Sequence, residues 1–203
     1  MKINFKNIFL LILFSFLFTN FSSAKELRTR FGFYIDLPNN FIAIQDLNVD
    51  ELLKESDDNN INKDYFNEMV AGSSKNDLNI EFYFPKNIDA EINSININIQ
   101  TETTVKEMLK DFKLNDICPY YKEMYENLFN KRIKQYYCKF NNNFKPKFQT
   151  VINVKHTGSV PGQLMTQYQF DLNKKLVTFT VGCEPKHCKS MEQAATNIIR
   201  SIN

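Results

Sequence analysis

The sequence predicts an α+β domain in which an antiparallel β-sheet is packed with helices. Apolar residues alternate with polar ones in several short segments, and segments with helical spacing lie between them and at the end of the chain. Alternating strands bury one face and are typical of antiparallel sheets, whereas continuous apolar runs are typical of buried parallel strands. No internal repeat, linker or second core interrupts this pattern, so we expect a single domain.

The first residues have the layout of a secretory signal peptide. Lys2 and Lys6 precede an apolar run over residues 8–18, and small residues lead to Ala24. We therefore expect residues 1–24 to be removed on export. The apolar run is shorter than the roughly 20 residues that span a bilayer. The remaining protein is expected to have no stable membrane span and to be periplasmic or secreted.

The charges of the expected domain, residues 25–203, balance. Without Lys2 and Lys6, 23 basic residues face 23 acidic ones. A neutral chain with scattered charges lacks the basic footprint of nucleic-acid or anionic-membrane binding. We therefore expect no nucleic acid as a partner.

The first half of the domain mixes strands with short helices. Phe31, Phe33, Ile35 and Leu37 share one face of a first strand, which Pro38 ends. The other elements expected before residue 113 are an extended segment at 39–44, helices at 47–55 and 63–71, strands at 78–84 and 94–101, and a helix from Thr103 or Thr104 to Phe112.

The second half predicts an antiparallel meander between two helices. A helix is expected after Pro119, ending near Phe129, and a final helix at 189–202. The turn at residues 171–174 and the loop at 157–163 separate the later strands. The strands of the meander are expected at 131–140, 147–156, 163–172 and 175–182.

Both ends of the domain resemble a known family. In "RFGFYIDLPNNFIAI", Phe33, Ile35, Leu37, Pro38 and Phe41 match the opening of PsbP-like domains, including DcrB-type exported proteins, with Phe41 in place of the usual Trp. The closing hairpin, strand and helix are similar as well. The resemblance implies an α/β/α sandwich and an accessory or binding role, and it carries over no catalytic residue.

The four cysteines are expected to form two disulfides, because the chain is expected to be exported. Three connectivities exist, and we expect Cys118–Cys138 and Cys183–Cys188. Cys118 is expected to precede a helix, with Cys138 on the following strand. Cys183 continues the inward face of the last strand, and Cys188 lies on the apolar face of the last helix.

An alternative hypothesis is a thiol- or metal-handling protein that uses Cys183, His187 and Cys188. Cysteine and histidine suit zinc or copper. However, adjacent residues such as His187 and Cys188 rarely point at one ion, and thioredoxin-like motifs have two intervening residues where this chain has four. We therefore expect no metal and no cofactor.

The polar face of the sheet is the main candidate for binding. Asn96, Asn98, Gln167 and Gln169 fall on the polar side of their strands, where they could bind a partner, a peptide or a glycan. The alternative is that this face is solvated or covered by the helices at 47–71. His187 is a further candidate, as is the loop at 158–162 with its tyrosine neighbours.

No catalytic set is apparent. His156 lies near Ser159 in "HTGS", but no nucleophile elbow or glycine-rich phosphate loop is present. The expectation is an exported, non-catalytic accessory or binding protein, monomeric, with an unknown envelope protein or small ligand as its partner. A hydrolase whose cleft the sequence does not reveal is the remaining alternative.

Overall fold

The computed structural model describes residues 24–44, 80–86, 92–101, 103–134, 136–158 and 160–203. The expected signal peptide and the expected helices at 47–55 and 63–71 therefore lie outside the described residues, apart from Ala24.

The described residues form one seven-stranded antiparallel sheet and one two-stranded ribbon. The order of the large sheet is β3-β4-β5-β9-β8-β7-β6, and the ribbon joins β1 to β2. The strands are β1 (Ala24–Arg28), β2 (Tyr34–Pro38), β3 (Phe41–Ala43), β4 (Ile80–Pro85), β5 (Ser94–Gln100), β6 (Tyr136–Phe140), β7 (Val151–Thr157), β8 (Leu164–Leu172) and β9 (Lys175–Cys183). The α+β class expected from the alternation is confirmed.

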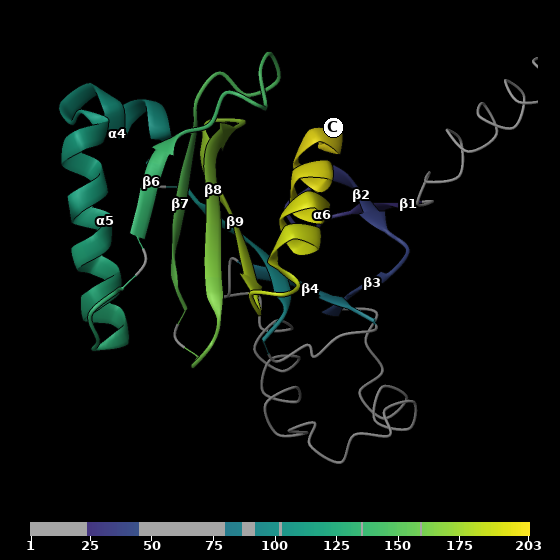
Figure 1. The fold of residues 1–203 in the computed structure, drawn as a ribbon. Coiled ribbons are helices and arrows are strands. Elements are labelled where there is room, and N and C mark those ends of the chain that lie inside the picture. Colours follow the sequence, from purple (N-terminus) through teal and green to yellow (C-terminus); the bar gives the residue numbers. More distant parts are fainter. Residues whose placement is uncertain (1–23, 45–79, 87–91, 102, 135, 159) are drawn as a thin grey trace, which may run out of the picture.

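Helices cover both faces of the sheet (Figure 1). Helix α5 (Leu114–Phe129) lies on one side and α6 (Cys188–Ser201) on the other, with β1 and β2 beyond α6. The short helix α4 (Val105–Asp111) precedes α5 and is capped by Thr104. This arrangement is the helix–sheet–helix sandwich that the resemblance implies.

Two separate apolar clusters follow from this layering. On the α6 side, aromatic and branched residues such as Phe170, Phe179 and Ile198 are fully buried. On the α5 side, a smaller cluster joins Val105 and Ile117 to the outward-facing residues of β7 and β9. The sheet separates the two clusters, so each helix layer has its own packing partner.

Helix α5 begins earlier than the sequence predicts. The backbone N–H of Lys113 donates to the Asp116 carboxylate at 3.1 Å, which caps the helix and lets it begin at Leu114. Pro119 is tolerated inside it because the proline removes only the bond to the carbonyl of Asn115, an exposed residue near the start of the helix. Cys118 consequently lies within α5, not before it.

Polar contacts fix where each helix meets the sheet. The Asp171 carboxylate, at the end of β8, accepts from the backbone N–H groups of Val105 at 2.6 Å and Lys106 at 3.0 Å, which anchors the start of α4. At the other end, Asn203 and Tyr34 exchange two backbone hydrogen bonds, so the residues after α6 are tied to β2.

Candidate functional site

The "VGCEPKHC" segment contains a disulfide in this structure. Cys183 is bonded to Cys188 with 5.1 Å between their Cα atoms, and this bond links the end of β9 to the start of α6. A second disulfide joins Cys118 on α5 to Cys138 on β6. Both pairs have the connectivity expected from the sequence, and each joins a helix to a strand.

The arrangement gives no support to thiol or metal chemistry at this segment. Both sulfur atoms are bonded to each other, so neither is available as a thiolate ligand or nucleophile. Throughout the described ranges, no group of three His, Cys, Asp or Glu side chains is placed to hold a metal ion. His187 is the N-cap residue of α6 but its side chain makes no capping hydrogen bond, and its Nε2 lies 3.8 Å from the Glu184 carboxylate.

The four amides predicted to form a binding face differ in whether a helix buries them. Gln167 and Gln169 are buried beneath α5, where the hydroxyl of Tyr121 donates to Gln169 at 2.6 Å and the hydroxyl of Tyr125 donates to Gln167. Burial raises the pKa of Tyr121 to about 12, so it remains a donor throughout the physiological range.

Asn96 and Asn98 lie in the same rows of the sheet and are half-buried. The register places Asn96 opposite Thr180 and Asn98 opposite Thr178. The cover over Gln167 and Gln169 is therefore α5. The sequence suggested a solvated face, or cover by the helices at 47–71, as the alternative to a binding face, and residues 47–71 lie outside the described part.

A large hollow lies on the opposite face of the sheet. It is a groove of about 1080 Å³ between α6 and the β6–β8 end of the sheet, beyond the part of this face that α6 covers. Tyr137 and Lys139 of β6, Lys155 of β7 and Tyr168 of β8 contribute to its lining, and the loop at residues 141–144 bounds it. We call this hollow the β6–α6 groove.

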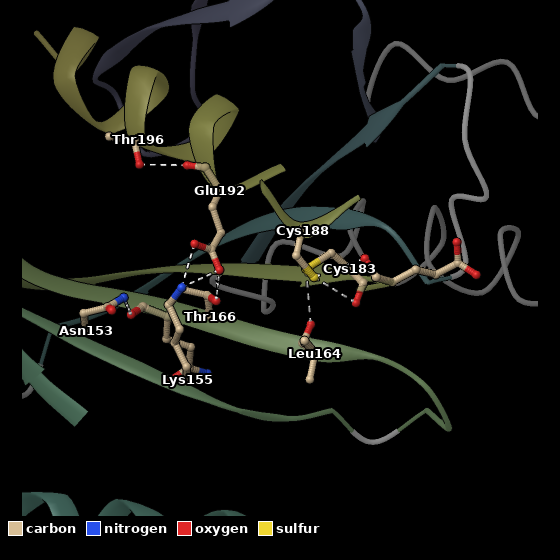
Figure 2. A network of polar contacts seen from close by, with 10 residues as sticks. Asn153, Lys155, Leu164, Thr166, Cys183, Cys188, Glu192 and Thr196 are labelled. Atoms are coloured by element: carbon tan, nitrogen blue, oxygen red, sulfur yellow. Dashed lines mark hydrogen bonds and ion pairs between the residues drawn. A yellow bond between two sulfur atoms is a disulfide. The ribbon is translucent and has the colours of Figure 1, made fainter. Parts of the chain in front are cut away.

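A charged contact between α6 and the sheet is made by residues that line the groove, and Figure 2 shows its hydrogen bonds. The Lys155 ammonium lies 2.7 and 2.6 Å from the two carboxylate oxygens of Glu192, and the Thr166 hydroxyl donates to the same carboxylate at 2.8 Å. The Asn153 amide donates to the backbone carbonyl of Gln167 at 3.0 Å. Glu192, which projects from α6, is thereby held against the strands.

The groove is locally basic although the expected mature chain is neutral. Its lining contains four lysines, at positions 134, 139, 155 and 189, and Glu192 as the one acidic residue. Lys155 already pairs with Glu192. The other three lysines are exposed and form no ion pair within the described residues, although Lys139 lies 4.9 Å from the Tyr137 ring centre. The groove therefore has an uncompensated positive charge, which favours an anion.

Aromatic and amide groups accompany this charge. Tyr137 and Phe140 on β6 keep 39% and 40% of their surface exposed, which is high for side chains of this size. Tyr168 is buried, packs edge-on against Phe144 at 5.7 Å, and has its pKa raised to about 12 by burial and by the nearby Glu192 carboxylate. The asparagines at positions 141–143 add hydrogen-bonding groups at the rim.

Nothing in this lining has the arrangement of a catalytic centre. Glu192 is engaged by a lysine and a hydroxyl, and the other titratable groups of the lining are lysines, tyrosines and His156. His156 is buried with its Nδ1 donating to the Thr157 carbonyl at 2.9 Å. Its ring stacks on Tyr125 with 4.3 Å between ring centres. The residues of the groove are suited to holding a ligand.

Comparison with solved structures identifies the fold. The solution structure of cyanobacterial PsbP (CyanoP) from Synechocystis sp. PCC 6803 matches with a TM-score of 0.51 over 92% of this chain and 95% of that one, at 8% identity. The fold is PsbP-like. A crystal structure from Bacteroides thetaiotaomicron VPI-5482 matches with a TM-score of 0.44 and 8% identity, over 89% of this chain and 48% of that one. No protein-family model and no curated protein matches the sequence.

Within this PsbP-like fold, the sequence did not point to the groove. Its residues come from β6, β7, β8, α6 and a loop, and they form no motif in the chain. One signal was present: Lys155, whose side chain is 41% exposed, lies on the face of β7 and β8 that also carries the buried residues Val151 and Phe170. A charged and partly exposed side chain on such a face marks the place where the helix does not fully cover it. None of the helices in the described ranges is both long and apolar enough to cross a bilayer.

Proposed function

We propose that this protein is an exported, non-catalytic binding protein, and that the β6–α6 groove holds an anionic ligand. The observation that carries the proposal is the charge of the groove: four lysines against one glutamate that is already paired. The PsbP-like fold and two disulfides are consistent with export, and they support the expected signal peptide over residues 1–24 and a single domain over residues 25–203.

The contacts in the groove explain how an anion would be recognised. Lys134 and Lys139 lie on the β6 side and Lys189 lies on α6, so a ligand in the groove has ammonium groups on both sides. Lysine ammonium groups are strongly hydrated point charges on flexible side chains, so they can bind anions of varied shape. Tyr137 and Phe140 add apolar contact area, which gives some selectivity beyond charge.

The proposal is tested with an acrylate oligomer, a flexible polycarboxylate that has no peptide groups. The purified domain is titrated by calorimetry at low and high salt. We expect binding that weakens as salt is added, because exposed charges are screened. The variant Lys134→Glu/Lys139→Glu/Lys189→Glu is expected to lose this binding.

A matched variant separates the groove from overall charge. Lys86→Glu/Lys106→Glu/Lys175→Glu changes the net charge by the same amount at exposed positions outside the groove lining. We expect this control to bind the oligomer nearly as well as the native domain. Equal losses in both triple variants, or no binding by the native domain, would contradict the proposal.

A further inference from the structure

β6 lies at one end of the seven-stranded sheet, and the groove begins beside it. Among the described strands its one neighbour is β7. The direction of its backbone groups follows from the bond just beyond the strand, where the Asn141 N–H donates to the Val151 carbonyl at 2.8 Å. In an antiparallel ladder, hydrogen-bonded pairs alternate with pairs whose backbone groups point away from each other.

This alternation determines which β6 groups are open. The register pairs Phe140 with Ile152, and one step further it places Asn141 opposite Val151, where the hydrogen bond lies. By the alternation, Lys139 and Tyr137 are bonded to β7 as well. The N–H and C=O groups of Tyr136, Cys138 and Phe140 therefore point away from the sheet. In the described part of the chain, no strand pairs with this side of β6.

We propose that an extended acidic segment of a partner protein adds to the sheet as a strand beside β6. This inference rests on the proposed function and names the ligand class of the same groove. The open backbone groups of β6 supply main-chain hydrogen bonds, which give affinity to an added strand. The neighbouring lysines supply the charge preference.

The side chains of β6 set which side of the added strand enters the groove. Tyr137 and Lys139 line the groove and lie on the same face of the sheet as Lys155. Alternate side chains of an added strand point to that face. Acidic residues at every second position would then lie among Lys134, Lys139 and Lys189.

The same lysines disfavour a second copy of this chain as the occupant. If two β6 strands paired, the lysines of one copy would lie close to those of the other, and like charges across a strand pair are destabilising.

The position of β6 is also fixed in the absence of a bound segment. The Cys118–Cys138 disulfide and the bond from the Tyr136 hydroxyl to the Cys118 carbonyl tie β6 to α5, which lowers the entropic cost of ordering it.

The test uses a capped peptide that alternates glutamate with threonine, titrated into the isotopically labelled native domain and followed by nuclear magnetic resonance. We expect the largest amide shifts at Tyr136, Cys138 and Phe140, with smaller shifts in the groove. A second peptide has the same side chains but every amide N-methylated, so it keeps the charge and cannot pair as a strand. It is expected to cause no shift at those three amides.

A pair of protein variants tests the edge itself. Phe140→Pro removes an N–H that points away from β7 and leaves the ladder to β7 intact, since proline is compatible with the open side of an edge strand. Phe140→Ala is its control and removes the ring alone. We expect the proline variant to bind the alternating peptide about fivefold more weakly than the alanine variant, the loss of one hydrogen bond.

The outcomes separate this inference from the proposed function. If the N-methylated peptide binds as well as the unmodified one, strand addition is wrong while anion binding stands. If neither peptide nor the acrylate oligomer binds, the proposed function is wrong as well. If the β6 amides shift with protein concentration in the absence of peptide, the edge pairs with a second copy and the inference is overturned.

Discussion

The two faces of the sheet differ in how far a helix covers them and in how polar their residues are. The face under α6 is mainly apolar, with Phe170, Phe179 and Ile97 fully buried, yet α6 leaves its β6–β8 end open as a basic groove. The face under α5 contains the buried amides of Gln167 and Gln169, yet α5 covers them and its tyrosine hydroxyls donate to both. The polar face is closed over Gln167 and Gln169, and the mainly apolar face contains the open site.

The difference shows that polarity along a strand does not by itself locate a binding surface. A buried amide is acceptable when each of its polar atoms finds a partner, and α5 supplies two tyrosine donors at successive helical turns. An apolar face becomes a binding surface where its helix is too short or too far along the sheet to cover it. The predictions below test this contrast.

The largest effect is expected from removing the disulfide that ties α5 to β6. The two cysteines are separated by 20 positions, and chain entropy gives about 3 kcal/mol of stabilisation for a loop of that size. For the Cys183–Cys188 loop, with a separation of 5, the same relation gives about 2 kcal/mol. Urea unfolding of Cys118→Ala/Cys138→Ala and of Cys183→Ala/Cys188→Ala measures both losses.

The order of these two losses tests how each face is held. A larger loss for the Cys183–Cys188 pair would contradict the loop-length argument, because the shorter loop would then contribute more than the longer one. That result would mean that the link between β9 and α6 matters more for stability than the link between α5 and β6.

A second effect is expected from the hydroxyl of Tyr125. Tyr125→Phe leaves the Gln167 side-chain oxygen with the Gln169 amide at 3.5 Å as its remaining donor, a weak contact. Burying a poorly satisfied amide costs about 1–3 kcal/mol in the free energy of unfolding. Tyr120→Phe is the control, because Tyr120 is 65% exposed. Adding Gln167→Leu to Tyr125→Phe should restore much of the loss, and failure to do so would contradict a buried hydrogen bond.

The sequence predicted which residues of a strand share a face and how the cysteines pair, but it did not predict which helix covers which part of the sheet. Alternation placed Val177, Phe179 and Val181 on one face, and the structure keeps them there. The α5 start was missed because Pro119 was taken as a helix boundary, whereas the contact between Lys113 and Asp116 sets the start at Leu114. The groove could not be predicted, because it depends on how far α6 extends across the sheet.

A third effect concerns acid stability and the buried ring of His156. Burial lowers the pKa of His156 below its usual value of 6.5, so the folded protein holds the ring neutral while the unfolded chain takes up a proton more readily. The stabilisation is therefore present above about pH 6.5 and is lost as the pH falls through the lowered value. His156→Phe retains a ring for stacking on Tyr125 and should flatten the fall in unfolding free energy on the acid side. An unchanged slope in this variant would contradict a neutral buried imidazole.

The smallest effect on stability, and the most informative for the groove, is expected at the Lys155–Glu192 pair. The two side chains are 41% and 25% exposed, so breaking the pair should change the unfolding free energy by less than about 1 kcal/mol. Binding should respond in opposite directions. Lys155→Met leaves the Glu192 carboxylate unpaired in the groove and should weaken binding of the acrylate oligomer, whereas Glu192→Gln releases the Lys155 ammonium and should strengthen it. If both variants shift binding in the same direction, the Lys155–Glu192 pair affects binding through the shape of the groove wall and not through its charge. Ligand selection at the open end of this face would then depend on shape.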